Sequence, residues 1–78
     1  MTSPSATVDI TREVCPLTYV RTKLALERLG PGERLEVLLR GDEPLRNVPR
    51  SAREEGHTVV SLEPRGDGSF RLLLEKAR

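Results

Sequence analysis

Apolar and polar residues alternate along four short stretches of the chain, which is the pattern of strands that bury one face. In the first stretch, Val8 and Ile10 fall on the same face. Gly and Pro gather in the segment 64–68 between the last two stretches, and this predicts a hairpin that joins them. The stretches are Thr7 to Ile10, Arg34 to Arg40, His57 to Glu63 with its alternation through Thr58, Val60 and Leu62, and Ser69 to Lys76.

Helix-forming residues fill the chain from Cys15 to Leu29, and Gly30-Pro31-Gly32 is expected to end that helix. At about 100° per residue, its apolar residues fall into two stripes, so the helix is expected to have two contact surfaces. The first stripe comprises Thr18, Tyr19, Thr22, Ala25, Leu26 and Leu29. The second comprises Leu17, Val20 and Leu24, which either pack on another helix or stay open for docking.

A second helix is expected between Gly41 and Gly56. Asp42 is expected to cap a helical segment that starts near Pro44. Pro49 is expected to kink or restart this helix, because proline lacks the N–H that the helical hydrogen bond needs. The apolar residues at helical spacing are Leu45, Val48 and Ala52.

The predicted order is therefore β-α-β-α-β-β. The β-α-β crossover makes the first two strands parallel and, by its usual handedness, places both helices on one face of the sheet. We expect an α/β (α+β) two-layer sandwich with a mixed four-stranded sheet. Residues 1–6 are expected to form a flexible N-terminal tail, and residues 7–78 a single domain.

Size and charge narrow the function classes. A chain of 78 residues, 36% of them apolar, is too small to build an enclosed pocket for a large cofactor, so none is expected. The net charge of +1 gives no general attraction for DNA. Because the sequence has neither a secretory signal nor a long apolar run, a cytoplasmic protein away from the membrane is the expectation.

The single cysteine, Cys15, stands directly before Pro16, a residue favoured at the first position of a helix. Cys15 is then the N-cap, near the backbone N–H groups of Leu17 and Thr18 and the positive end of the helix dipole. Both favour the nucleophilic thiolate. The alternative is that a lone cysteine is simply a small buried hydrophobic residue.

Several segments carry a resemblance to a known family, in matching order and spacing. They are Val8-Asp9-Ile10, Cys15-Pro16-Leu17-Thr18, Leu29-Gly30-Pro31-Gly32-Glu33, Asn47-Val48-Pro49-Arg50 and Glu54-Glu55-Gly56-His57. With them the chain resembles the TusA (SirA-like) sulfur carriers, small domains in which a Cys-Pro-x-Pro motif opens the first helix.

The resemblance implies a sulfurtransferase that carries sulfane sulfur as a persulfide on Cys15. Its donor would be a cysteine desulfurase or rhodanese-like protein, and its acceptor would serve tRNA thiolation, cofactor synthesis or sulfur metabolism. Two positions depart from the family pattern: Thr18 replaces the second motif proline, and Arg12 stands where the family often has Gly. We hypothesise that Thr18 supplies hydrogen bonds to the sulfur while the carrier chemistry is preserved.

The remaining candidate residues are a histidine, two aromatic residues and a set of arginines. His57 is expected to lie in a loop or at the start of a strand rather than to act as a base, and one Cys with one His cannot complete a zinc site. The competing function is a noncatalytic protein- or RNA-interaction module on the same fold, although only Tyr19 and Phe70 offer rings for base stacking. A basic rim for a partner, or else a solvated face, is predicted at Arg12, Arg21, Arg28, Arg46 and Arg50.

Overall fold

The computed structural model describes residues 4–12 and 17–77, without the side chains of Leu17 and Thr18. The elements follow the predicted order. The strands are β1 (Ala6–Asp9), β2 (Arg34–Arg40), β3 (Thr58–Pro64) and β4 (Ser69–Glu75), and the helices are α1 (Leu17–Glu27) and α2 (Asp42–Glu54). β1 begins one residue before the expected start at Thr7.

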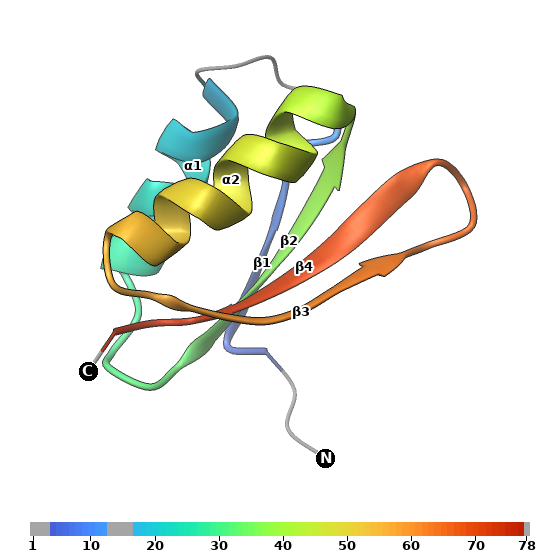
Figure 1. Ribbon diagram of the computed structural model, residues 1–78. Helices are drawn as coiled ribbons and strands as arrows, with labels where there is room; N and C mark the ends of the chain where they lie inside the picture. The colour runs from blue at the N-terminus through green and yellow to red at the C-terminus, as the bar shows by residue number, and fades with distance from the viewer. Residues whose placement is uncertain (1–3, 13–16, 78) are drawn as a thin grey trace.

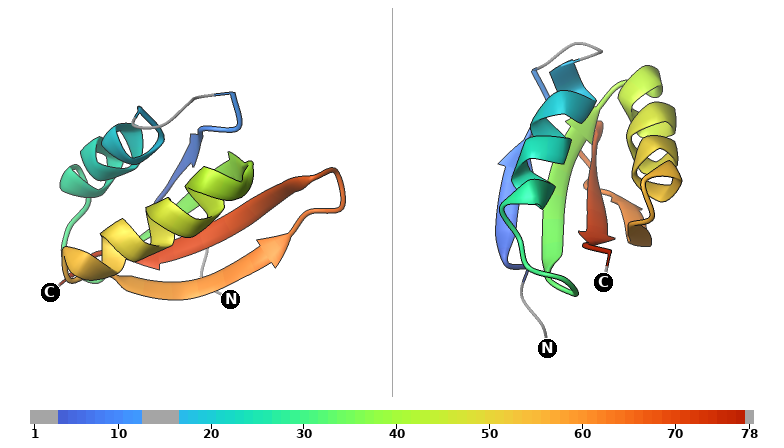
Figure 2. Two further views of the ribbon diagram at one scale, coloured as in Figure 1. Left: turned by 45° about the horizontal axis from the view of Figure 1, so that its top comes forward. Right: turned by 90° about the vertical axis from the view of Figure 1, so that its left-hand side faces the viewer.

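The four strands form one sheet in the order β1-β2-β4-β3. β1 pairs parallel with β2, whereas β2 and β4 pair antiparallel, as do β3 and β4. Both helices lie on the same face of the sheet (Figure 2). The predicted two-layer fold, with a mixed sheet and a C-terminal hairpin, is therefore confirmed.

The hydrophobic core lies between the helices and the sheet. Strand pairing places Leu35 opposite Leu74 and Val37 opposite Leu72 on the helix-facing side, where all four side chains are fully buried. The opposite face of the sheet carries charge, with ion pairs between Glu36 and Arg71 and between Arg34 and Glu75. The core also contains Ile10, Leu26, Leu39, Val48 and Ala52.

α1 buries the first of its two predicted stripes. Thr22 and Leu26 are buried, and Tyr19, Ala25 and Leu29 pack partly buried against the core. The helix ends at Glu27, and the chain then tightens into a turn in which Arg28 N donates to the carbonyl oxygen of Ala25. In the second stripe, Val20 is 45% and Leu24 54% exposed, so the side chains of these two residues stay partly open to solvent.

α2 differs from its prediction at its start. Its N-cap is Gly41, at φ 100°, and no side chain caps the helix, because Asp42 is already its first residue. Glycine reaches this positive φ without the steric cost of a side chain, so the chain turns sharply from β2 into the helix. The predicted Asp42 cap is therefore wrong.

Pro49 does not restart α2, which runs as one helix from Asp42 to Glu54. Pro49 is buried on the core side of the helix. Apolar burial of its ring against the core offsets the hydrogen bond that its missing N–H cannot make. Of the two predicted outcomes, the restart is therefore wrong, and the kink stays a prediction.

A β-bulge interrupts the pairing of β3 with β4 between Val59 and Ser61. Because one extra residue shifts the alternation, Thr58 pairs with Glu75 on the open face while Leu62 pairs with Leu72 on the helix side. The predicted single face through Thr58, Val60 and Leu62 is wrong for this reason.

Strand pairing also locates the two ends of the domain. Ala6 pairs with Leu35 and Glu75 pairs with Arg34, so β1 starts and β4 finishes beside the beginning of β2. α1 starts beyond the other end of β1 (Figure 1). Within the described parts of the chain, neither helix is long and apolar enough to cross a membrane.

Candidate functional site

The starts of both helices gather at one end of the sheet. β1 and β2 run parallel, and each is followed by a helix that packs back over the sheet. The first turns of α1 and α2 therefore lie beyond the carboxyl ends of these two strands (Figure 1). This is the end of an α/β sheet where ligand and partner sites commonly form, because backbone N–H groups of the helices point outward there.

A local turn fixes the chain direction where β1 ends. The carboxylate Oδ1 of Asp9 accepts hydrogen bonds from Thr11 N at 2.9 Å and Thr11 Oγ1 at 2.7 Å. These hydrogen bonds hold the pKa of Asp9 below its usual value. Ile10 is buried between them, and its N–H donates to the carbonyl oxygen of Leu38 at 2.8 Å. The Asp9–Thr11 turn therefore anchors the strand just before the predicted motif.

The predicted motif lies largely outside the described residues. Cys15 and Pro16, and with them the predicted cap, fall in the segment 13–16. Leu17 and Thr18 are described by their backbone, which forms the first residues of α1. The backbone N–H groups of a first helical turn have no partner within the helix. α1 begins two residues after Cys15, at the end of the sheet where α2 also begins, and the N–H groups of its first turn lie there.

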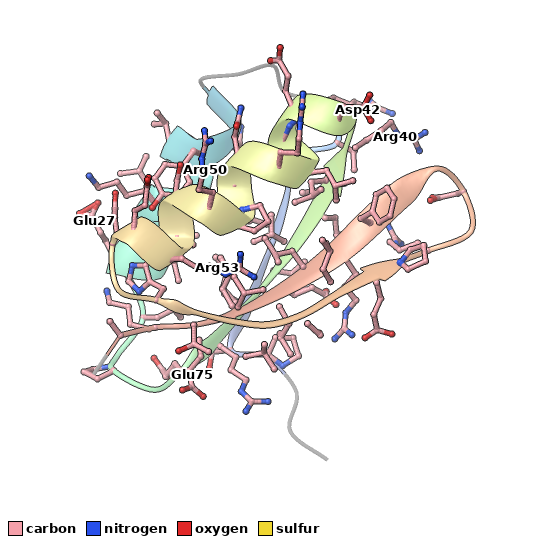
Figure 3. The ribbon with its side chains drawn as sticks, in the orientation of Figure 1. Glu27, Arg40, Asp42, Arg50, Arg53 and Glu75 are labelled. Atoms are coloured by element: carbon pink, nitrogen blue, oxygen red, sulfur yellow. The ribbon has the colours of Figure 1, made fainter. Side chains whose placement is uncertain are left out.

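The arginines of the predicted rim come from several elements of the fold. Arg21 lies on α1 and Arg28 directly after it, and both line a groove beside β1. Arg46 and Arg50 are exposed on α2, where Arg46 Nε donates to the carbonyl oxygen of Asp42 and Arg50 Nη2 to Asn47 Oδ1. Figure 3 shows Arg50 and Arg53 leaving α2 in different directions. Arg12 is exposed beyond β1.

Sequence reasoning missed the groove between α1 and β1. It has a volume of about 440 Å³ and is open to the side of the molecule where β1 forms the edge of the sheet. The sequence held two signals of it: Leu24 belongs to the apolar stripe without an assigned contact, and Arg21 and Arg28 were predicted in a basic rim. The residues that line it are Ala6, Thr7, Val8, Arg21, Leu24, Ala25, Arg28 and Leu29.

His57 lies away from the start of α1. It follows α2, whose 13 residues span about 20 Å and run back toward the beginning of β2. Its Nδ1 accepts a hydrogen bond from Ala77 N at 3.0 Å, which ties the last strand to the turn after α2. Residues 4–12 and 17–77 contain no group of three or more His, Cys, Asp and Glu side chains that could hold a metal ion.

Comparison with protein families decides what kind of domain this is. The family described as "Sulfurtransferase TusA" matches residues 6–76, which span every helix and strand of the fold. The chain belongs to the TusA family. The match includes the segment that holds Cys15, although it does not test the replacement of the second motif proline by Thr18.

Individual TusA-family relatives agree with the match. A protein of Archaeoglobus fulgidus named "Putative sulfur carrier protein" is 44% identical over 69 residues, which are 88% of this chain and 78% of that protein. A Thermotoga maritima protein of the same name is 33% identical over 69 residues, covering 88% of this chain and 87% of the relative.

The crystal structure of the SirA-like protein of Desulfitobacterium hafniense superposes on this TusA-family domain with a TM-score of 0.82. The two chains are 26% identical, and the alignment covers 94% of this chain and 99% of the other. The two-helix sandwich is therefore shared along nearly the whole length of both proteins.

Proposed function

We propose that this protein carries sulfane sulfur as a persulfide on Cys15. The donor is a persulfide-bearing protein of the cysteine desulfurase or rhodanese type. The acceptor is a second protein whose thiol feeds tRNA thiolation, cofactor synthesis or another branch of sulfur metabolism. One observation carries the proposal: a chain of the TusA family contains a single sulfur nucleophile, Cys15.

The transfer needs no cofactor and no net oxidation. The Cys15 thiolate attacks the outer sulfur of the donor persulfide R–S–SH. A new S–S bond forms at Cys15, the donor S–S bond breaks, and the donor leaves as the thiolate R–S⁻. An acceptor thiolate then attacks the outer sulfur on Cys15 in the same way and regenerates the Cys15 thiolate.

The start of α1 supports this chemistry. The helix begins two residues after Cys15, so the N–H groups and the positive dipole end of its first turn favour an anion on the cysteine sulfur. The small fold supports it too, because a carrier presents its sulfur to two different proteins in turn. Those partners supply the rest of each reacting site.

The test is intact-protein mass spectrometry after incubation with a cysteine desulfurase and L-cysteine, or with a rhodanese and thiosulfate. Formation of one persulfide adds about 32 Da, and dithiothreitol removes it. The gain is absent in Cys15→Ser. Wild-type protein alkylated with iodoacetamide before incubation serves as a second control and also gains nothing.

A noncatalytic protein- or RNA-interaction module, in which Cys15 is inert, would give a different result. Its mass would stay unchanged with every donor, and Cys15→Ser would behave like the wild type. That outcome overturns the proposal.

A further inference from the structure

β1 leaves one edge of the sheet open. Among residues 4–12 and 17–77, the strand order places β2 on one side of β1 and no strand on the other. Within the pairing, the N–H of Ile10 turns inward to the carbonyl oxygen of Leu38. Because alternate residues of a strand direct their backbone groups to opposite sides, Thr7 and Asp9 direct theirs toward the open edge. An incoming strand finds hydrogen-bonding groups there.

The groove lies directly over this edge. Its floor is formed by β1, and its wall by Arg21 and Leu24 of α1 and by Arg28 in the turn that follows α1. Leu24 is 54% exposed, which is the largest exposure among the described large hydrophobic side chains. A strand added to β1 would direct every second side chain to the helix side, against this wall.

The positive charges in the wall of the groove favour an acidic ligand. Among the described lining residues, Arg21 and Arg28 are the only charged ones. They stand on either side of Leu24, over about 10 Å of α1 and the turn that follows it. In an extended strand, residues i, i+2 and i+4 share one face over about 13 Å. A segment of the form acidic-x-apolar-x-acidic therefore matches the order Arg21, Leu24, Arg28 in both chemistry and length.

We infer that β1 and the groove bind an extended acidic segment of a partner protein, which adds to the edge of the sheet as a fifth strand. The inference rests on the proposed function, for which it supplies a docking surface. Cys15 lies in the chain between β1 and α1, the two elements that form the groove. A docked partner segment is thus held beside the two elements that carry the sulfur-bearing residue.

The test uses a synthetic peptide as a model of the partner segment. Its sequence is Thr-Glu-Thr-Val-Thr-Glu-Thr with blocked ends, and a matched peptide carries Lys in place of both Glu. Binding is followed by NMR titration of the ¹⁵N-labelled protein. The acidic peptide should shift the amide signals of Thr7, Asp9 and Leu24 with a Kd of about 1 mM or tighter, and the Lys peptide should not.

Three variants locate the binding. Arg28→Glu should weaken the acidic peptide about tenfold, whereas Arg53→Glu, on α2 beyond the groove, should leave its Kd unchanged. Thr7→Pro removes the outward N–H and should abolish binding. Thr7→Ala, which loses only the side-chain hydrogen bond to Glu36, should bind like the wild type. The spectrum of each variant reports whether it is folded.

Several results would overturn the inference. They are equal shifts with the acidic and the Lys peptide, no shift at Thr7 or Asp9 at saturating peptide, or equal weakening by Arg28→Glu and Arg53→Glu. A single-stranded RNA heptamer that binds through Arg28 while the acidic peptide does not would assign the groove to nucleic acid. Sulfur loading of Cys15 by a small persulfide needs no docked partner. If Cys15 fails to take up sulfur from a small persulfide, that result overturns the proposed function without bearing on whether the groove binds the acidic peptide.

Discussion

The hydroxyl of Tyr19 on α1 donates a hydrogen bond to the backbone carbonyl oxygen of Ser51 on α2, at 3.4 Å. This contact joins the two helices on the side of α1 away from the groove. An ion pair between Lys23 and Glu55 lies along the same seam. The helix pair is therefore fastened by polar contacts as well as by its shared core.

The tyrosine contact predicts a pH dependence. Burial, with the nearby carboxylates of Glu55 and Glu54, raises the pKa of Tyr19 to about 12. Above its ordinary pKa of 10.0, the unfolded chain loses this proton before the folded one, so stability falls between pH 10 and about 12. Urea unfolding at pH 9 and pH 11 should show a smaller loss for Tyr19→Phe than for the wild type. An equal loss in both proteins would contradict the assignment.

The ion pair between Glu36 and Arg71 on the open face of the sheet predicts a loss of stability at low pH instead. Hydrogen bonds from Arg71 and Thr7 hold the pKa of Glu36 below its usual value, so its contribution is present above about pH 4.5 and lost as the pH falls further. Glu36→Gln should lower the free energy of unfolding by about 0.5–1 kcal/mol at pH 7, since the pair is partly exposed.

The difference between Glu36→Gln and the wild type should be smaller at pH 3 than at pH 7, because lowering the pH protonates more of the native carboxylate and so removes the charge of the ion pair. Urea unfolding at both pH values measures it. A destabilisation of the same size at pH 3 and pH 7 would show that lost packing, not the ion pair, causes the effect.

Two leucines of α1 predict contrasting responses to truncation. Leu26 is 1% exposed in the core, so Leu26→Ala should cost about 2–5 kcal/mol of unfolding free energy. Leu24 belongs to the groove wall, so Leu24→Ser should change stability by no more than about 0.5 kcal/mol. Thermal or urea unfolding separates the two. A large loss in Leu24→Ser would mean that this residue supports the fold rather than a partner.

The motif predicts an effect on the cysteine. Thr18 offers a backbone N–H and a hydroxyl near the start of α1, and proline at that position offers neither. Thr18→Pro should therefore raise the pKa of Cys15. The rate of alkylation by iodoacetamide, followed by mass spectrometry from pH 5 to pH 10, gives this pKa in each protein. A lower pKa in the proline variant would rule out a hydrogen-bonding role for Thr18.

The strands and the core stripe of α1 follow from the sequence because burial on one side repeats with a fixed period. Leu35, Val37 and Leu39 show this most clearly, since all three are fully buried on the helix-facing side. The Asp42 cap fails because Gly41 makes the turn by its own positive φ, a backbone property that outweighs side-chain preference. The predicted single face of β3 fails for a related reason. The bulge at Val60 adds one residue that reverses the alternation, and nothing in the composition of the strand signals it.

The groove could not be derived from local patterns. It depends on β1 occupying an edge of the sheet, which strand order decides, and on the side of α1 that meets that edge. The predicted arginine rim stays a prediction, although the placement of Arg21 and Arg28 along this groove could not be derived from the sequence either. The sequence singles out Cys15 because it stands directly before Pro16 at the start of a helix, and its role stays a prediction.

The opposed placement of the chain ends and the start of α1 has a practical consequence. β1 starts and β4 finishes beside the beginning of β2, away from the first turn of α1. A tag, a surface tether or a second domain fused through a short linker at either end leaves the end of the sheet near the cysteine uncovered. The fold can thus be joined to other modules, or immobilised on a sensor chip, at the end of the sheet opposite the one where both helices begin.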